Sequence, residues 1–359
     1  MKRTAFIMVL LLSLIIFVGC AEDKYPPVDS SEEEANVVIS LKIEDKEYEV
    51  RYELYRALFL NRKSAVDGGN SQVWAGADAS EYIDKINSLI VNDAVEIFSM
   101  LHLANKIGFD PYSEKANYEV KEMFEADIES YGSAGGLSNE EKYNAYLTYL
   151  KQLNHNYSTA DLLYRYSLAT EAVNSYYRTE YEYTKDDVKN YYFSDDCARI
   201  LQAYFQKGVK TYAAMEIYRE NLVSIDNELS LAAQIIGSSS ANETDLIDNG
   251  VLSGIMVGKK SLSQRKYSGY INEIFSLSAG EMSNIITLEN TNAQTDGYYL
   301  VYRLNKNDEH FETFYPAVAN SYIDNLVGGI LGGMENALDE SKSFTDAYNR
   351  ISHKDISMN

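Results

Sequence analysis

The chain has 359 residues, of which 45% are hydrophobic and 31 are tyrosine, so it is long and apolar enough to bury the cores of roughly two domains. Its formal net charge is −22 at pH 7. Such an acidic chain lacks the excess of Lys and Arg that neutralises phosphates, which argues against nucleic acid as a partner.

The N-terminus predicts an export signal followed by a lipid anchor. Two basic residues precede an apolar run over 5–18, and small Gly19 stands immediately before Cys20. The run is shorter than the roughly 20 residues that span a bilayer. This order resembles the lipobox of bacterial lipoproteins, which implies that residues 1–19 are removed and that a lipid on Cys20 anchors the chain to the extracytoplasmic face of the cell membrane. An ordinary transmembrane anchor and a signal cleaved without lipidation are the alternatives.

The segment 20–35 is predicted to be a flexible tether, because it contains a proline pair and an acidic run without an apolar period. Removing residues 1–19 takes away two positive charges, so the net charge falls from −22 to −24. An anionic membrane surface would repel the mature chain, and the lipid must do the anchoring. With Cys20 lipidated, Cys197 has no partner for an internal disulfide, and the core must hold the fold.

The segment 36–194 is predicted to be a helical domain that opens with one small hairpin. Alternating β-branched residues from Val37 onward favour two short strands. Apolar residues recur at spacings of three and four through 80–107, which places them on one face of a long helix. Ser138 with Glu141 is typical of a capping box and starts a later helix.

The pattern changes at Cys197. Residues 195–306 are predicted to form a compact α/β unit, with strands expected over 198–205, 250–257, 284–288 and 298–304. The segment 307–359 then returns to helix, and we expect that helix to pack back onto the N-terminal helices.

Several motifs occur in the order found in PrsA- and SurA-type foldases. They are YTKDDVKNYY at 183–192 with ARIL at 198–201, LA at 231–232, FSL and GEMS within 275–283, and GYYLV at 297–301. This resemblance implies an α+β fold, in which a mainly helical chaperone domain from the N- and C-terminal segments carries an inserted parvulin-like α/β domain. It also implies a membrane-anchored foldase that binds unfolded or newly secreted polypeptides and needs no cofactor.

The resemblance also implies the residues of a peptidyl-prolyl isomerase site. Arg199, Ser238 and Tyr299 stand at the family's catalytic positions, and Tyr270 and Phe275 at its substrate-binding positions. Parvulins typically carry histidines where this chain has Arg199 and Tyr299. We therefore expect weak or lost isomerase activity, because arginine is a permanent charge where a neutral ring usually lies. An active isomerase with an altered pocket and a non-catalytic envelope scaffold are the alternatives.

No metal site is expected. The four histidines are far apart and show no metal-ligand spacing, and no Walker loop, nucleophile elbow or dinucleotide fingerprint occurs. Without a resolving cysteine, Cys197 is expected to be a buried strand residue rather than a reactive thiol.

Overall fold

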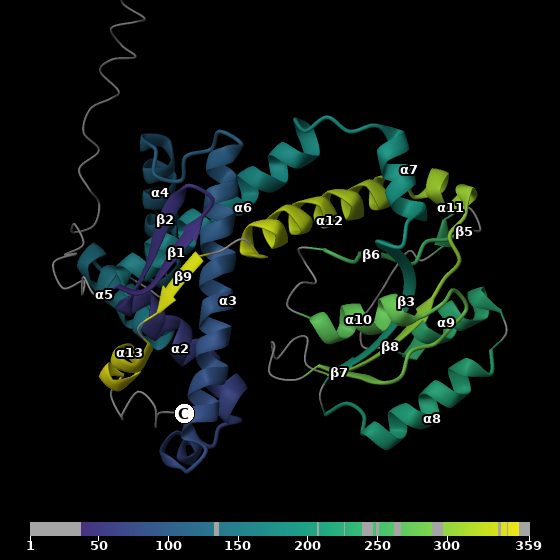
Figure 1. Ribbon diagram of the computed structural model, residues 1–359, viewed down its shortest axis with the longest axis horizontal. Helices are drawn as coiled ribbons and strands as arrows, with labels where there is room; N and C mark the ends of the chain where they lie inside the picture. Colours follow the sequence, from purple (N-terminus) through teal and green to yellow (C-terminus); the bar gives the residue numbers. More distant parts are fainter. Residues whose placement is uncertain are drawn as a thin grey trace, which may run out of the picture.

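The computed structural model describes residues 37–132, 136–206, 208–225, 227–238, 247–248, 251–261, 267–288, 297–336, 339–342 and 344–351. The predicted signal, Cys20 and the tether lie outside these residues. Figure 1 shows a helical body and a sheet domain side by side, with two connections between them. One connection runs from α6 (Tyr157–Thr179) to α7 (Lys185–Phe193), and the other is α12 (Tyr315–Asn336).

A small antiparallel sheet opens the helical body. β1 (Val37–Ile43) lies between β2 (Lys46–Arg51) and β9 (Asp339–Lys342), so a strand from the end of the chain pairs with the first one. The hairpin turn places Glu44 at φ 55°, a left-handed conformation. The strand β9 differs from the helix predicted for the C-terminal segment. It forms because the free edge of β1 offers unpaired backbone groups.

The helices of this body pack in one large core and one smaller cluster. They are α2 (Tyr52–Asp67), the short η1 (Ser71–Ala75), α3 (Ala79–Lys106), α4 (Glu114–Gly132), α5 (Asn139–Gln152), α6 and, near the C-terminus, α13 (Phe344–Arg350). The helix α3 buries one continuous stripe, including Ile86, Ile90 and Leu101, because its apolar residues follow the helical period. A second cluster joins α4, α5 and α6, with Phe124 stacked on Tyr157 at 4.3 Å between ring centroids.

The helix α12 contributes to two cores. Its residues Ile323, Val327 and Leu331 join the core of the helical body. Its first turns join a junction cluster in which Val318 packs with Tyr192 of α7 and with α11 (Asp308–Thr313). One helix therefore holds the helical body and the sheet domain together, as Figure 1 shows.

The sheet domain is built on β3 (Cys197–Gln206), with strand order β6-β3-β8-β7 and every pairing antiparallel. One face packs against α8 (Tyr212–Val223) and α9 (Glu228–Ser238), and the other packs against α10 (Ser268–Ser276). The remaining strands are β4 (Ile247–Asp248), β5 (Val251–Leu252), β6 (Ile255–Gly258), β7 (Ile286–Leu288) and β8 (Gly297–Arg303). This architecture confirms the predicted α+β class. Among the described helices, none combines the length and the apolarity needed to cross a bilayer.

Candidate functional site

Three aromatic side chains meet on the α10 face of the sheet. Tyr299 of β8 lies opposite Tyr204 of β3, with ring centroids 4.7 Å apart, and contacts the ring of Tyr270 in α10 at 5.6 Å. The Tyr270 hydroxyl donates a hydrogen bond to the amide oxygen of Gln202. Because alternate strand residues share a face, Gln202 and Tyr204 necessarily lie on the same side of β3 as Ile200.

This face is filled rather than hollow at its centre. Tyr270 is 4% exposed and Tyr299 is 7% exposed, and both pack with Ile274 and Val301. Phe275 is only partly buried at the edge of this cluster, with the Arg303 guanidinium 5.6 Å from its ring centroid. The structure therefore brings together Tyr270, Phe275 and Tyr299 of the predicted site. Their roles in substrate binding and catalysis stay predictions.

Arg199 lies on the opposite face of the sheet. The residues that follow it at alternate positions, Leu201 and Ala203, pack against α8 and α9. Tyr204, the partner of Tyr299, is five residues further on, or about 17 Å along the strand. The structure thus separates Arg199 from Tyr299. Ser238 ends α9, and its side chain lies outside the described part of the chain.

Three backbone carbonyls hold the Arg199 guanidinium. Nε donates to Ser253 at 3.0 Å, one terminal nitrogen donates to Asn305 at 2.7 Å, and the other donates to Leu252. The side chain is buried, and this burial lowers the pKa of Arg199. Among the described contacts of this guanidinium, no carboxylate occurs. The arginine therefore ties the turn between β5 and β6 to the segment after β8.

A histidine that the sequence did not indicate lies beside this arginine. His310 of α11 is fully buried, with Nε2 2.6 Å from the same Ser253 carbonyl and Nδ1 2.9 Å from the Tyr192 hydroxyl. Burial and then the nearby charge of Arg199 lower the pKa of His310 to about 4. Both contacts are satisfied by a neutral ring that carries its proton on Nε2, because a carbonyl can only accept.

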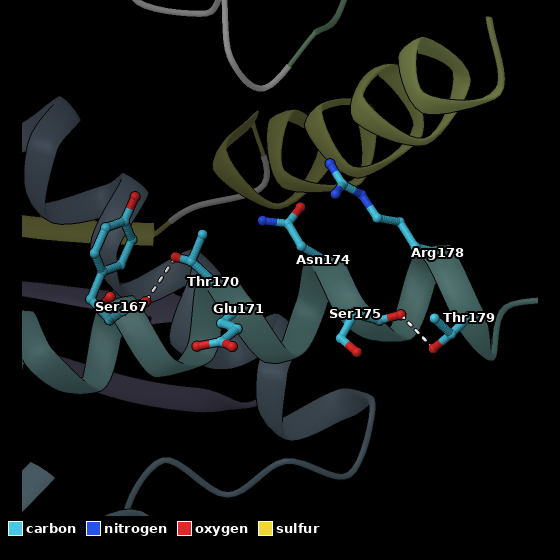
Figure 2. Close-up of a pocket in the computed structure, with 8 residues that line it drawn as sticks. Ser167, Thr170, Glu171, Asn174, Ser175, Arg178 and Thr179 are labelled. Carbon is cyan, nitrogen blue, oxygen red and sulfur yellow. Dashed lines mark hydrogen bonds between the residues drawn. The ribbon is translucent and has the colours of Figure 1, made fainter. Parts of the chain in front are cut away.

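A groove runs along the exposed face of α6. Figure 2 shows its lining side chains, of which Asn174 and Arg178 point toward α12. The lining consists of two parallel rows of residues spaced by four. They are Tyr166, Thr170, Asn174 and Arg178 in one row, and Ser167, Glu171, Ser175 and Thr179 in the other. The volume of the groove is about 650 Å³.

The groove is suited to a polypeptide backbone. From Tyr166 to Thr179 it spans about 20 Å, at about 1.5 Å of rise per residue, which equals about six residues of extended chain. Hydroxyl and amide groups line most of it, together with the charged Glu171 and Arg178, and an extended chain carries one donor and one acceptor per residue. The hydroxyls of Thr170 and Thr179 donate to helix carbonyls, at 2.7 and 2.8 Å. Their oxygens still have lone pairs for a peptide N–H.

Two other groups, a trio of possible metal ligands and the thiol of Cys197, are poorly suited as sites of chemistry. Glu44, Asp45 and His102 place ligand atoms within 4.8 Å of one another, the one such trio in the described ranges, but Lys106 already donates to both Glu44 oxygens at 2.8 and 3.1 Å. Cys197 is buried, and this burial raises the pKa of its thiol to about 11. A thiol with such a pKa is a poor nucleophile at neutral pH.

The chain is similar to solved PrsA foldases. Foldase protein PrsA from Streptococcus pneumoniae has 15% identity over 79% of this chain and 90% of that chain, with a TM-score of 0.27. PrsA from Lactococcus lactis has 13% identity over 89% and 100%, with a TM-score of 0.26. Peptidylprolyl isomerase (PrsA) from Bacillus anthracis has 14% identity over 68% and 95%, with a TM-score of 0.28.

No family model matches the chain, and no curated protein matches it. At the identities and TM-scores of the PrsA structures, the likeness carries no argument about activity. Function is therefore inferred from the residues of this chain.

Proposed function

We propose that the protein is a lipid-anchored foldase that binds unfolded secreted polypeptides outside the cytoplasm. The groove on α6 is the observation that carries this proposal. Its donors and acceptors match the repeating N–H and C=O groups of any extended chain, so binding there needs no particular client sequence. The lipid predicted on Cys20 and the acidic tether would hold this groove near emerging chains.

The sheet domain is proposed to have weak or lost prolyl isomerase activity. Arg199 is 4% exposed and lies on the α9 face, so it cannot contact a substrate held near Tyr299. On the α10 face, Tyr270 and Tyr299 are buried in one cluster, which leaves little of either ring exposed to a substrate proline. An active isomerase remains the alternative, because isomerisation needs only a pocket that twists an amide across a barrier of about 20 kcal/mol.

The test of client binding uses a soluble chain that begins at Ala21, which keeps every described contact of the fold. The measurement is light scattering during aggregation of several unrelated unfolded proteins. We expect suppression of aggregation for all of them. The double variant Thr170→Val with Asn174→Ala removes two polar groups of the groove and should weaken client binding about thirtyfold, since each lost hydrogen bond contributes about 1 kcal/mol.

A matched control lies on α5. Thr148 donates to the carbonyl of Asn144 at 2.9 Å, as Thr170 does to that of Tyr166, and Thr148 is exposed outside the groove. The variant Thr148→Val with Asn144→Ala should suppress aggregation as the parent chain does. Equal suppression by the groove variant and this control would remove the groove from the proposal.

The isomerase part has a separate test. In a protease-coupled assay with proline peptides, we expect turnover far below that of active parvulins. Turnover equal to theirs would overturn this part, and a foldase role for the α6 groove would be unaffected.

A further inference from the structure

Exposed apolar side chains concentrate on the sheet domain. Half of the large apolar side chains exposed in the described residues lie between positions 209 and 229, and each of them is 44% to 62% exposed. They are Val209, Tyr212, Ile217, Val223 and Leu229. Such a concentration is unusual on a surface that faces only water, because isolated apolar residues are the norm there.

The helix α8 carries the centre of this concentration. Its inner face buries Met215, Tyr218 and Leu222 against the sheet, which leaves the outer face unpartnered. Its start is well defined, because the Thr211 hydroxyl accepts a hydrogen bond from the Ala214 N–H at 3.2 Å. The outer face is therefore a stable surface rather than a frayed end.

Two carboxylates lie inside the apolar rim. At about 100° per residue, Tyr212 and Val223 lie on one edge of the exposed face and Ile217 on the other, with Glu216 and Glu220 between them. Within the described residues, neither glutamate makes an ion pair. These five residues are here called the α8 surface.

We propose that the α8 surface binds an apolar segment of another polypeptide that carries lysine or arginine at helical spacing. Apolar contact would cover Tyr212, Ile217 and Val223. Covering Glu216 and Glu220 would cost free energy unless cations of the partner paired with them. The charges thus specify the partner as basic and apolar.

The same charges argue against two other occupants. An anionic membrane would be repelled by Glu216 and Glu220. A second copy in a symmetric contact would place these acids against their own counterparts, on a chain whose net charge is already −22. Figure 1 shows α8 on the side of the sheet domain that is remote from α6 and α12, so this surface is separate from the groove.

The test uses two labelled 18-residue peptides of helical pattern, one with leucine and lysine and one with each lysine replaced by glutamate. The soluble chain from Ala21 should bind the lysine peptide saturably in fluorescence anisotropy, and the glutamate peptide should not bind. Ile217→Ser, a change at an exposed site, should raise the Kd about tenfold. Glu216→Lys with Glu220→Lys should abolish binding of the lysine peptide and create binding of the glutamate peptide.

A control of equal charge change is Glu47→Lys with Glu182→Lys, two exposed sites away from α8. This control should keep the Kd of the parent chain within about twofold. Equal losses in the control and in the α8 charge reversal would overturn the proposal, as would no saturable binding. Loss of binding in Thr170→Val with Asn174→Ala would assign the peptide to the α6 groove instead. Dimerisation in sedimentation that Ile217→Ser removes would assign the surface to a second copy.

Discussion

Acid should destabilise the junction between the helical body and the sheet domain through His310. The neutral ring accepts from the Tyr192 hydroxyl at Nδ1 and donates to the Ser253 carbonyl from Nε2. Protonation of Nδ1 ends the contact in which the ring accepts from Tyr192. Burial, followed by the charge of Arg199, lowers the pKa of His310 from 6.5 to about 4. The unfolded chain therefore takes up this proton first as the pH falls. The contribution of His310 is complete above pH 6.5 and decreases as the pH approaches 4.

The magnitude follows from the two pKa values. A difference between 6.5 and about 4 corresponds to about 3 kcal/mol when fully expressed, and to about 2.5 kcal/mol at pH 4.5. Between pH 7 and pH 4.5, the free energy of unfolding of the parent chain should thus fall by about 2.5 kcal/mol more than that of His310→Gln. Urea unfolding followed by circular dichroism at several pH values measures both.

Tyr192→Phe provides the control, because it removes one hydrogen bond and keeps the titrating ring. This variant should be less stable at pH 7 by about 1 kcal/mol and retain the fall toward pH 4.5. If the parent chain and His310→Gln lose stability in parallel, the reasoning about His310 is refuted.

Three further predictions concern the domain contact, the buried arginine and the anchor. A Cβ at Gly258 would lie 2.7 Å from the Cβ of Asn325 in α12, so Gly258→Val should lower the free energy of unfolding by about 1–3 kcal/mol. A Cβ at Gly332 would have no atom within 4 Å, so Gly332→Ala should not lower it. Limited proteolysis and urea unfolding compare the stability of the two variants. Arg199→Met removes three hydrogen bonds and leaves the carbonyls of Leu252 and Asn305 without this donor, while the carbonyl of Ser253 keeps the one from His310. The change should cost about 3 kcal/mol, seen as a lower Tm, and an unchanged Tm would contradict the structural role of this side chain. Cys20→Ala should release the protein from membranes into the medium or periplasm in cell fractionation, and membrane retention of the variant would exclude the lipid anchor.

Local patterns in the sequence predict much of the fold. The apolar spacing over 80–107 corresponds to α3 within one residue at each end, because a long amphipathic helix repeats its signal many times. The pair of Ser138 and Glu141 forms the predicted capping box, with reciprocal bonds of 3.3 and 2.8 Å. Such signals depend only on near neighbours in the chain, so no tertiary information is needed to interpret them.

Long-range features could not be predicted in this way. The strand β9 exists because β1 lies about 300 residues earlier with a free edge, and nothing within 339–342 indicates that partner. In β3, residues 197–201 are all buried, so alternation cannot reveal which face each one occupies. Arg199 and Tyr299 could therefore be assigned to one site by resemblance while the structure places them on opposite faces. For the same reason Gln202 could not be assigned to the α10 face, where it accepts from Tyr270. It precedes Tyr204 by two residues, and this spacing indicates a shared face of the strand.

Arg199 and His310 meet at one backbone carbonyl of the sheet domain. Both donate to the carbonyl of Ser253, so the sheet, the β5–β6 turn and α11 are joined at one atom. Arg199, which the resemblance aligns with a parvulin histidine, is thus part of a structural joint. These contacts attach α11, which packs against the start of α12, to the sheet domain. If the domain is retained for binding, Ile217→Ser should reduce binding of the lysine peptide and leave any residual prolyl turnover unchanged. If it is retained for catalysis, Tyr299→Ala should abolish turnover and leave peptide binding unchanged.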